Sequence, residues 1–441
     1  MENIIAVPET AHRRRERIML TGMDRILHLV DKHPNEPLQT LMHYINKTTL
    51  KEVHKRQENN KASGVDKETK TSYSKNLEEN IENLLSRMKT FSYRPQPVRR
   101  TYIEKEGKNE VRPLGIPAYE DRLVQGVIAE ILNVIYESKF YDFSYGFREA
   151  RDCHMAIKDL DKILFGNTNW IVDADIKGFF DNVDHKWMMK FLAHDIGDKN
   201  LLRYITRFLK SGVMEQGKFS ETEAGVAQGA LCSLVMANVY LHYVLDMWFE
   251  IRVKKTSRGM AEMVRYADDF VCCFQYEDDA RNFYEALKER LAKFGLEIAQ
   301  DKSQIIKFGR NAGNEAGKFD FLGFTFVGGK TRDGKFTAKP RTSEKKLKVK
   351  RVKASKWIWQ NMHTPIGILV NKLNVKLRGH YNYYGITHNY KKMMGFYRYN
   401  VRELFKALNR RGGKKKLNWE RYRKVLEISP LLKPYIAVSL W

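Results

Sequence analysis

Two adjacent aspartates inside a short apolar segment constrain this chain more than any other feature. Residues 263–274 read MVRYADDFVCCF and place Asp268 and Asp269 between two β-prone stretches. The pattern is typical of a tight β-hairpin, in which the strands supply rigidity and the turn presents the acids. Adjacent carboxylates repel each other unless cations neutralise them. The hairpin therefore predicts a Mg²⁺ site for phosphoryl transfer, and an acidic surface turn is the alternative.

The net charge of the 441-residue chain narrows the class of partner. A formal charge of +25 favours a polyanion, either nucleic acid or an anionic membrane. Residues 339–424 hold 25 Lys and Arg against 3 acids, with aromatic residues interleaved. A solvated helical face would account for many charged residues in this segment, but not for so large an excess of positive over negative ones. We therefore expect a nucleic-acid partner.

The same composition argues against several other classes of protein. We find no run of 18 apolar residues, so we expect no membrane-spanning segment and no membrane partner. There is no Cys-x-x-Cys pair, so no zinc site is expected, and nothing in the four cysteines implies a disulfide framework. A reducing, cytoplasmic setting follows. The cysteines are Cys153, Cys232, Cys272 and Cys273.

Hydrophobic periodicity divides the chain into a mixed part and a helical part. Helices are expected over residues 77–89, 121–137, 153–164, 185–194, 201–210, 230–249 and 278–294. Strands are expected over residues 111–116, 170–176, 296–298, 304–308 and 319–327, with an extended proline-rich stretch at 93–103. Beyond residue 339 the pattern is almost wholly helical. The fold class predicted is α+β, followed by an all-α basic domain.

A third carboxylate is needed if the hairpin serves two metal ions, because such ions lie about 4 Å apart and need ligands from separate elements. The strand expected at 170–176 carries Asp173 and Asp175. Period two places both on the same face, so spacing alone does not choose between them. Asp181 and Asp184 follow, and capping of the next helix is the favoured explanation for them.

A set of short motifs resembles those of group II intron reverse transcriptases. The motifs stand in the order of that family: RPLGIP at 112–117 with DRLVQ at 121–125, SYGFR at 144–148, DADIKGFFDNVDH at 173–185, RYADD at 265–269, DKS at 301–303 and FLGF at 321–324. LRGHYNYYG at 377–385 is similar to the maturase, or thumb, signature of the family. Several motifs in order are more specific than any single one.

The resemblance implies a metal site. Asp175 aligns with the catalytic aspartate of the strand, and Asp173 becomes a secondary candidate with a structural role. The expected metal ligands are Asp175, Asp268, Asp269 and the carbonyl of Ile176. Mg²⁺ is the expected ion, with Mn²⁺ as a substitute.

The resemblance also implies a nucleotide site. Phe180 falls where the family places an aromatic steric gate against ribonucleotides, and Phe179 is assigned to the core. Lys105 and Arg112 flank the finger hairpin, where they would bind triphosphate oxygens; generic basic surface residues are the alternative. Lys302 resembles a lysine that protonates pyrophosphate as it leaves, and a surface lysine in a turn is the alternative.

The loop at 227–234 departs from the family. The family usually has Pro-Gln-Gly-Gly and then Ser-Pro, where this chain reads AQGALCSL. Gln228 and Gly229 are retained, so backbone approach to the incoming nucleotide is expected. Without the two prolines, two φ angles are free and an N–H returns at each position. The loop is expected to lie differently against template and dNTP.

We expect an RNA-directed DNA polymerase that extends a DNA primer with dNTPs on an RNA template and binds structured intron RNA in bacterial cytoplasm. The expected domains are a helical N-terminal extension at 1–59, fingers and palm at 60–335, and a thumb/maturase domain at 340–441. No Cys/His cluster follows, so no zinc-stabilised endonuclease domain is expected. One alternative is a diverged stand-alone reverse transcriptase with a host role such as antiviral defence. Another is an RNA-binding splicing factor with a vestigial polymerase.

Overall fold

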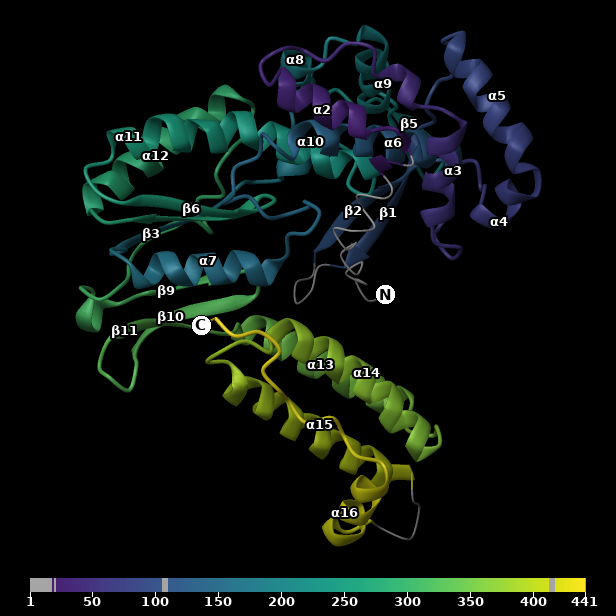
Figure 1. Cartoon of the computed structure of the whole chain (residues 1–441). Helices are drawn as coiled ribbons and strands as arrows, with labels where there is room; N and C mark the ends of the chain where they lie inside the picture. Colours follow the sequence, from purple (N-terminus) through teal and green to yellow (C-terminus); the bar gives the residue numbers. More distant parts are fainter. Residues whose placement is uncertain (1–17, 20, 105–109, 412–416, 441) are drawn as a thin grey trace.

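The computed structural model of the protein describes residues 18–19, 21–104, 110–411 and 417–440. Sheets and helices form a mixed body, and the C-terminal helices extend away from it as a separate layer (Figure 1). In these described ranges, no helix combines the length and the apolar character needed to cross a bilayer.

A four-stranded antiparallel sheet carries the predicted carboxylates. Its order is β6-β7-β3-β8. The bounds are β3 Trp170–Asp175, β6 Ala261–Tyr266, β7 Asp269–Phe274 and β8 Gln304–Lys307. The hairpin expected at 263–274 is confirmed as β6 and β7, which pair from Tyr266 and Asp269 outward. β3 lies between β7 and β8, so it brings a second segment of the chain to the hairpin.

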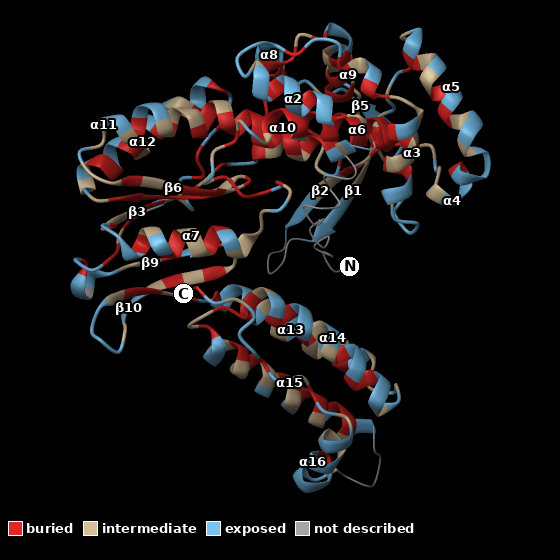
Figure 2. Cartoon of the chain, in the orientation of Figure 1, coloured by how far each residue is buried: buried red, intermediate tan, exposed pale blue. Residues whose placement is uncertain are grey.

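Helices pack on both faces of this central sheet. Helix α12 (Glu277–Lys293) contacts β3 and β7, and α7 (Cys153–Phe165) contacts β6 from the other side (Figure 1). Behind them, α6 (Tyr119–Tyr136) and α10 (Leu231–Leu241) pack against each other and are buried almost all round (Figure 2). A helix that is apolar on every side is stable only in such a core.

The helix expected over 230–249 is interrupted in an informative way. After α10 the chain continues as two π-helical turns, His242–Asp246 and Phe249–Val253. Each π turn widens the helix and changes which face the following residues occupy. The expectation of one buried helix is thus confirmed only up to Leu241.

A second sheet has the order β2-β1-β4-β5. The strands are β1 Val98–Glu104, β2 Val111–Ile116, β4 Val213–Glu215 and β5 Lys218–Ser220. β2 matches the expected strand, and β1 forms the second half of the expected extended stretch. The sequence did not predict β4 and β5, because three-residue strands are too short for a period to be recognised.

Two strand predictions are wrong, and one of them concerns the third sheet. Its strands, in the order β11-β10-β9, are β9 Lys318–Phe321, β10 Phe324–Lys330 and β11 Phe336–Thr342. The single strand expected over 319–327 is wrong, because Leu322 and Gly323 adopt φ values of 50° and 78° and reverse the chain. The strand expected over 296–298 is also wrong: only an isolated bridge joins Ile298 to Ile176.

The C-terminal helices are confirmed. They are α13 Glu344–Gln360, α14 Ile366–Tyr384, α15 Tyr390–Arg411 and α16 Trp419–Ile428. Their buried residues form one hydrophobic cluster with the third sheet. For example, the ring centroids of Phe324 and Tyr384 lie 5.2 Å apart. The basic helices are therefore anchored to the sheets by a shared core, although they extend away from them.

Most of the remaining helices surround α6 and α10 in the upper part of Figure 1, whereas α11 (Lys254–Thr256) lies beside α12. The others are α2 Asp24–Lys32, α3 Lys47–Arg56, α4 Lys70–Tyr73, α5 Leu77–Lys89, α8 His185–Asp195 and α9 Lys199–Leu209. The expected helices at 77–89, 185–194 and 201–210 are confirmed within two residues at each end.

Candidate active site

Three carboxylates gather at one edge of the central sheet. Asp175 ends β3 and Asp269 begins β7, and the two residues are direct partners across the antiparallel ladder. Directly opposed residues in such a ladder have Cα atoms about 4.5–5.5 Å apart. Asp268 precedes Asp269 in the turn after β6. Fold topology thus brings together the acids that the sequence placed in separate motifs.

Burial raises the pKa of these carboxyl groups. The pKa of Asp269 rises to about 7, chiefly because of burial and then because of the charges on Asp173 and Asp268. Burial also raises the pKa of Asp268, and the charge on Asp175 adds to the rise, while the charges on Arg112 and Arg265 oppose it. The carboxylates repel one another and are poorly solvated, so a bound cation would stabilise their charged forms.

Asp173 lies on the same strand but in a different setting. Burial raises its pKa to about 6, and the hydrogen bond from Gln304 Nε2 to Asp173 Oδ2, at 3.4 Å, opposes that rise. In the ladder it is paired with Val271 rather than with an acid of the hairpin. Asp175 rather than Asp173 is the direct ladder partner of Asp269, although the charge on Asp173 also raises the pKa of Asp269.

Lys302 directly contacts one of the acids. Its Nζ donates a hydrogen bond of 2.9 Å to Asp175 Oδ2, and this bond raises the pKa of the lysine. The same turn fixes the end of β3, because the Asp175 N–H donates to Ser303 Oγ at 3.2 Å and the Ala299 N–H donates to the Asp175 carbonyl at 2.8 Å. Lys302 is half-exposed, so its ammonium group is accessible to a substrate.

The backbone of Ile176 points toward the hairpin side. The Asp175 carbonyl and the Lys177 N–H both bond to the segment at 297–299, at 2.8 Å each. Backbone groups alternate along an extended chain, so those of Ile176 are directed to the opposite side, where β7 and its turn lie. This direction is compatible with the predicted role of the Ile176 carbonyl as a metal ligand.

Arg112 lies on the β1–β2 hairpin, opposite Ile103 in the ladder. Its side chain is exposed, and its charge reaches far enough to lower the pKa of Asp268. Lys105, the other predicted phosphate ligand, lies outside the residues that the structure describes. Arg112 thus connects the second sheet electrostatically to the carboxylates.

Phe179 lies in the core, as predicted, and Phe180 packs against the edge of the same core. Phe179 is 2% exposed and belongs to the core, whereas Phe180 is only partly buried. Their rings meet edge to face with centroids 5.4 Å apart. Downstream, the Asp184 side chain caps α8 by accepting from the Trp187 N–H at 2.8 Å, which confirms the capping explanation for that residue.

The loop that departs from the family lies between Phe180 and β2. At its start, the Val226 N–H donates to the Phe180 carbonyl at 2.8 Å. Two residues later, the Gln228 carbonyl accepts from the Gly115 N–H of β2 at 2.7 Å. Gly229 has a φ of 113°, and a Cβ there would lie 2.7 Å from the Gly115 carbonyl oxygen. Both the conformation and the contact require glycine at this position.

One buried cluster next to the hairpin was not predicted. Arg265, inside the RYADD motif, pairs with Asp246 in the core, and both side chains are fully buried. A signal existed in the sequence. Asn238, His242 and Asp246 are polar residues spaced by four in an apolar helical segment, and this spacing places them on one side of a helix.

The donor atoms at the edge of the sheet that carries Asp175, Asp268 and Asp269 (the carboxylate edge) show which metal ion could bind there. In the described part of the chain, no group of three or more His, Cys, Asp or Glu side chains is arranged to hold a metal ion by itself. Mg²⁺, however, is usually bound by one or two carboxylates and completed by waters and substrate phosphates. The oxygen-only donors at the β3–β7 edge fit such an ion.

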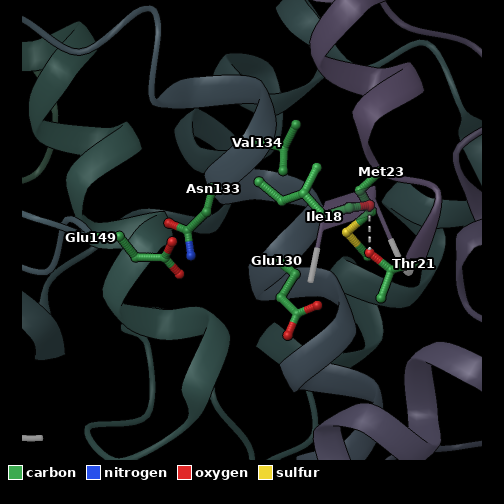
Figure 3. Close-up of a pocket in the computed structure, with 7 residues that line it drawn as sticks. All are labelled: Ile18, Thr21, Met23, Glu130, Asn133, Val134 and Glu149. Atoms are coloured by element: carbon green, nitrogen blue, oxygen red, sulfur yellow. Dashed lines mark hydrogen bonds between the residues drawn. The ribbon is translucent and has the colours of Figure 1, made fainter. Parts of the chain in front are cut away.

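A small cavity elsewhere in the molecule has a different character. It measures about 10 Å³, room for about one water molecule. Glu130, Asn133 and Glu149 approach it from one side, and Ile18, Thr21 and Met23 from the other (Figure 3). None of the predicted site residues lines this cavity, so it is separate from the candidate active site.

Comparison with known proteins adds independent information. A family model described as "Reverse transcriptase (RNA-dependent DNA polymerase)" matches residues 103–326, just over half of the chain. This range includes Arg112, Asp175, Asp268 and Lys302. It therefore spans β2, the central sheet and the loop between Phe180 and β2.

Individual relatives point the same way. The "Group II intron-encoded protein LtrA" of Lactococcus lactis subsp. cremoris is 41% identical over 177 residues, 40% of this chain and 29% of that protein. "Protein YkfC" of Escherichia coli is 30% identical over 276 residues, 55% of this chain and 71% of that protein. The alignment with LtrA thus covers less than a third of that relative. A solved telomerase from Candida albicans matches 76% of this chain with 14% identity and a TM-score of 0.43, too weak a likeness to argue from.

Proposed function

This chain belongs to the reverse transcriptase family, in its group II intron type, and we propose that it is an RNA-directed DNA polymerase. It would extend a primer 3′-hydroxyl with dNTPs along an RNA template. One observation carries the proposal: Asp175 and Asp269 are direct ladder partners, with Asp268 in the adjoining turn. Phosphoryl transfer needs such a set of carboxylates from separate elements at one place.

The family uses a divalent metal ion, and Mg²⁺ is the ion proposed here, with Mn²⁺ as a substitute. Asp175, Asp268, Asp269 and the carbonyl of Ile176 would hold it. Bound metal would favour ionisation of the primer hydroxyl and neutralise charge on the phosphates. The raised pKa values of Asp268 and Asp269 support this assignment, because they identify carboxylates that lack a neutralising partner.

The nucleotide would be held by the second sheet and the loop beside it. Arg112 and Lys105 would bind triphosphate oxygens, for which a guanidinium can form paired hydrogen bonds. Gln228 and Gly229 would bring backbone close to the base and sugar. The ring of Phe180 would exclude a 2′-hydroxyl and so select dNTPs. The tie between Phe180 and Val226 supports a shared site.

Lys302 would donate a proton from Nζ to the departing pyrophosphate. Its bond to Asp175 supports this role, because it holds the ammonium group against a proposed metal ligand, beside which the phosphates would bind. The bond also raises the pKa of Lys302, so the proton is present at neutral pH.

The C-terminal helices would bind nucleic acid. Residues 339–424 carry 22 of the 25 net positive charges, and α13–α16 supply most of that range. Fingers and palm would occupy 60–335 and thumb 340–441, with 1–59 as an N-terminal extension. The same basic surface would bind structured intron RNA, and the intron-encoded relatives favour this role over a host-defence or vestigial enzyme.

Primer extension tests the proposal directly. Asp268→Ala should abolish dNTP incorporation on an RNA template, because a metal ligand is lost, while RNA affinity in a filter-binding assay stays near the wild-type value. Asp278→Ala is the matched control, since Asp278 is an exposed aspartate on α12. Measurable extension by the Asp268 variant would refute the assignment.

A further inference from the structure

Arg265 is a fully buried arginine three residues before the catalytic candidate Asp268. Its side chain is 0% exposed. Five hydrogen bonds use its guanidinium: two to the carboxylate of Asp246 and one each to Ser144 Oγ, Asn238 Oδ1 and the Ala267 carbonyl. A buried charge pair contributes little net stability compared with apolar packing, so stability alone does not account for this cluster.

The partners of Arg265 come from separate elements of the fold. Asp246 ends the π-helical turn His242–Asp246, and Asn238 lies on α10. Ser144 belongs to the loop before α7. The Nδ2 of Asn238 donates to the Gly146 carbonyl at 2.7 Å, so that loop is also tied to α10. The guanidinium therefore has a fixed place relative to the core.

The bond to Ala267 reaches the metal-site turn itself. Arg265 Nη1 donates to the Ala267 carbonyl at 2.9 Å, and Ala267 has a φ of 60°, which is uncommon for a residue with a Cβ. The loop packs on the same turn: a Cβ on Gly146 would lie 2.3 Å from the Ala267 nitrogen. The backbone immediately before Asp268 is thus fixed from both sides.

We propose that Arg265, fixed by Asp246, is a positioning residue that sets the Ala267–Asp268 backbone and thereby the affinity of the carboxylate edge for its metal. The inference rests on the proposed function and adds a residue that contacts neither metal nor substrate. Groups behind a metal ligand commonly act in this way, because they fix the orientation of the ligand.

Arg265→Lys tests the inference. Lysine retains a positive charge for Asp246, but its ammonium cannot reach acceptors spread around a planar guanidinium. Mn²⁺ binding to the protein without nucleic acid, measured by electron paramagnetic resonance, should weaken about tenfold. The Mg²⁺ concentration for half-maximal primer extension should rise by a similar factor. A purely structural role would lower the active fraction and leave both metal dependences unchanged.

Arg290→Lys is the matched control. Arg290 Nε and Nη2 donate to the carbonyls of Val244 and Tyr243, at 2.9 and 3.0 Å, in the π turn that carries Asp246. This variant should leave Mn²⁺ affinity unchanged. If it weakens Mn²⁺ binding as much as Arg265→Lys does, loosened packing is the cause and the inference is wrong.

Ser144→Ala removes one acceptor of the guanidinium and keeps the Asp246 pair. It should weaken Mn²⁺ binding severalfold, and it decides the matter if Arg265→Lys does not fold. Wild-type Mn²⁺ affinity in a folded Arg265→Lys variant, or in Ser144→Ala when the lysine variant does not fold, would overturn the inference. A wild-type protein that neither binds Mn²⁺ nor extends a primer would instead overturn the proposed function.

Discussion

The hydroxyl of Tyr383 donates a hydrogen bond of 2.9 Å to the carbonyl of Leu322. Tyr383 lies near the end of α14, and Leu322 lies in the turn between β9 and β10. Burial raises the pKa of Asp269, and a hydrogen bond from the Leu322 N–H opposes that rise. One turn residue thus connects a C-terminal helix to the carboxylate edge.

Tyr383→Phe should lower the free energy of unfolding by about 1–2 kcal/mol, because the Leu322 carbonyl loses its donor in a partly buried place. Thermal unfolding of the purified protein measures this. Tyr381→Phe is the control. The Tyr381 hydroxyl is buried without a hydrogen-bond partner among the described residues, so its removal should cost almost nothing. Equal melting temperatures for the two variants would contradict the prediction.

Gly229→Ala should reduce primer extension at least tenfold. The substitution forces an unfavourable φ and a contact with the Gly115 carbonyl, at a cost of about 1–3 kcal/mol, and the loop would move away from β2. Gly217→Ala isolates the contact, because Gly217 has a φ of 81° and open space around its Cβ position. If both variants keep the wild-type extension rate, the position of the loop does not matter for the reaction.

Phe180→Val should admit ribonucleotides. A smaller side chain leaves room for a 2′-hydroxyl, and the preference for dNTP over rNTP should fall by about 10–100-fold in kcat/KM. Single-nucleotide extension with each substrate measures the ratio. Phe219→Val, at a phenylalanine 53% exposed on β5, should leave the ratio unchanged. An unaltered ratio for the Phe180 variant would assign that ring to the core.

His380 makes the protein sensitive to acid. Burial, with the nearby charge of Lys350, lowers its pKa to about 3. In the unfolded chain His380 takes up a proton near pH 6.5, whereas in the folded protein it stays neutral down to about pH 3. The free energy of unfolding is therefore highest above pH 6.5 and falls as the pH drops toward 3. The loss of stability reaches about 5 kcal/mol.

His380→Phe should therefore flatten the dependence of stability on pH between 6.5 and 3. Both ring nitrogens of His380 are buried without a hydrogen-bond partner in the described ranges, and the Phe396 ring lies 4.3 Å away. A phenyl ring suits these surroundings, so the variant should also be at least as stable as the wild type at pH 7. Urea unfolding at several pH values measures both effects, and unchanged acid sensitivity would contradict the pKa argument.

Local pattern was enough for most of the elements that matter here. The apolar residues on either side of Asp268 and Asp269 predicted the β6–β7 hairpin, and period two predicted β3. Short or interrupted strands carry too little pattern to be recognised from the sequence. β4 and β5 are too short to show a period, and the turn at Leu322 lies within the short run FLGF at 321–324, where Gly323 is the only break in the apolar residues.

The sequence by itself determined the acids, the excess of positive charge and the resemblance that singled out Asp175. Only the tertiary structure decided that Asp175 lies opposite Asp269 and that the buried Asp246 forms an ion pair with Arg265 of the hairpin. The physical reason is the range of the interactions. Strand and helix periodicity depends on neighbours a few residues apart, whereas the partner of a buried polar group is set by whichever distant segment packs against it.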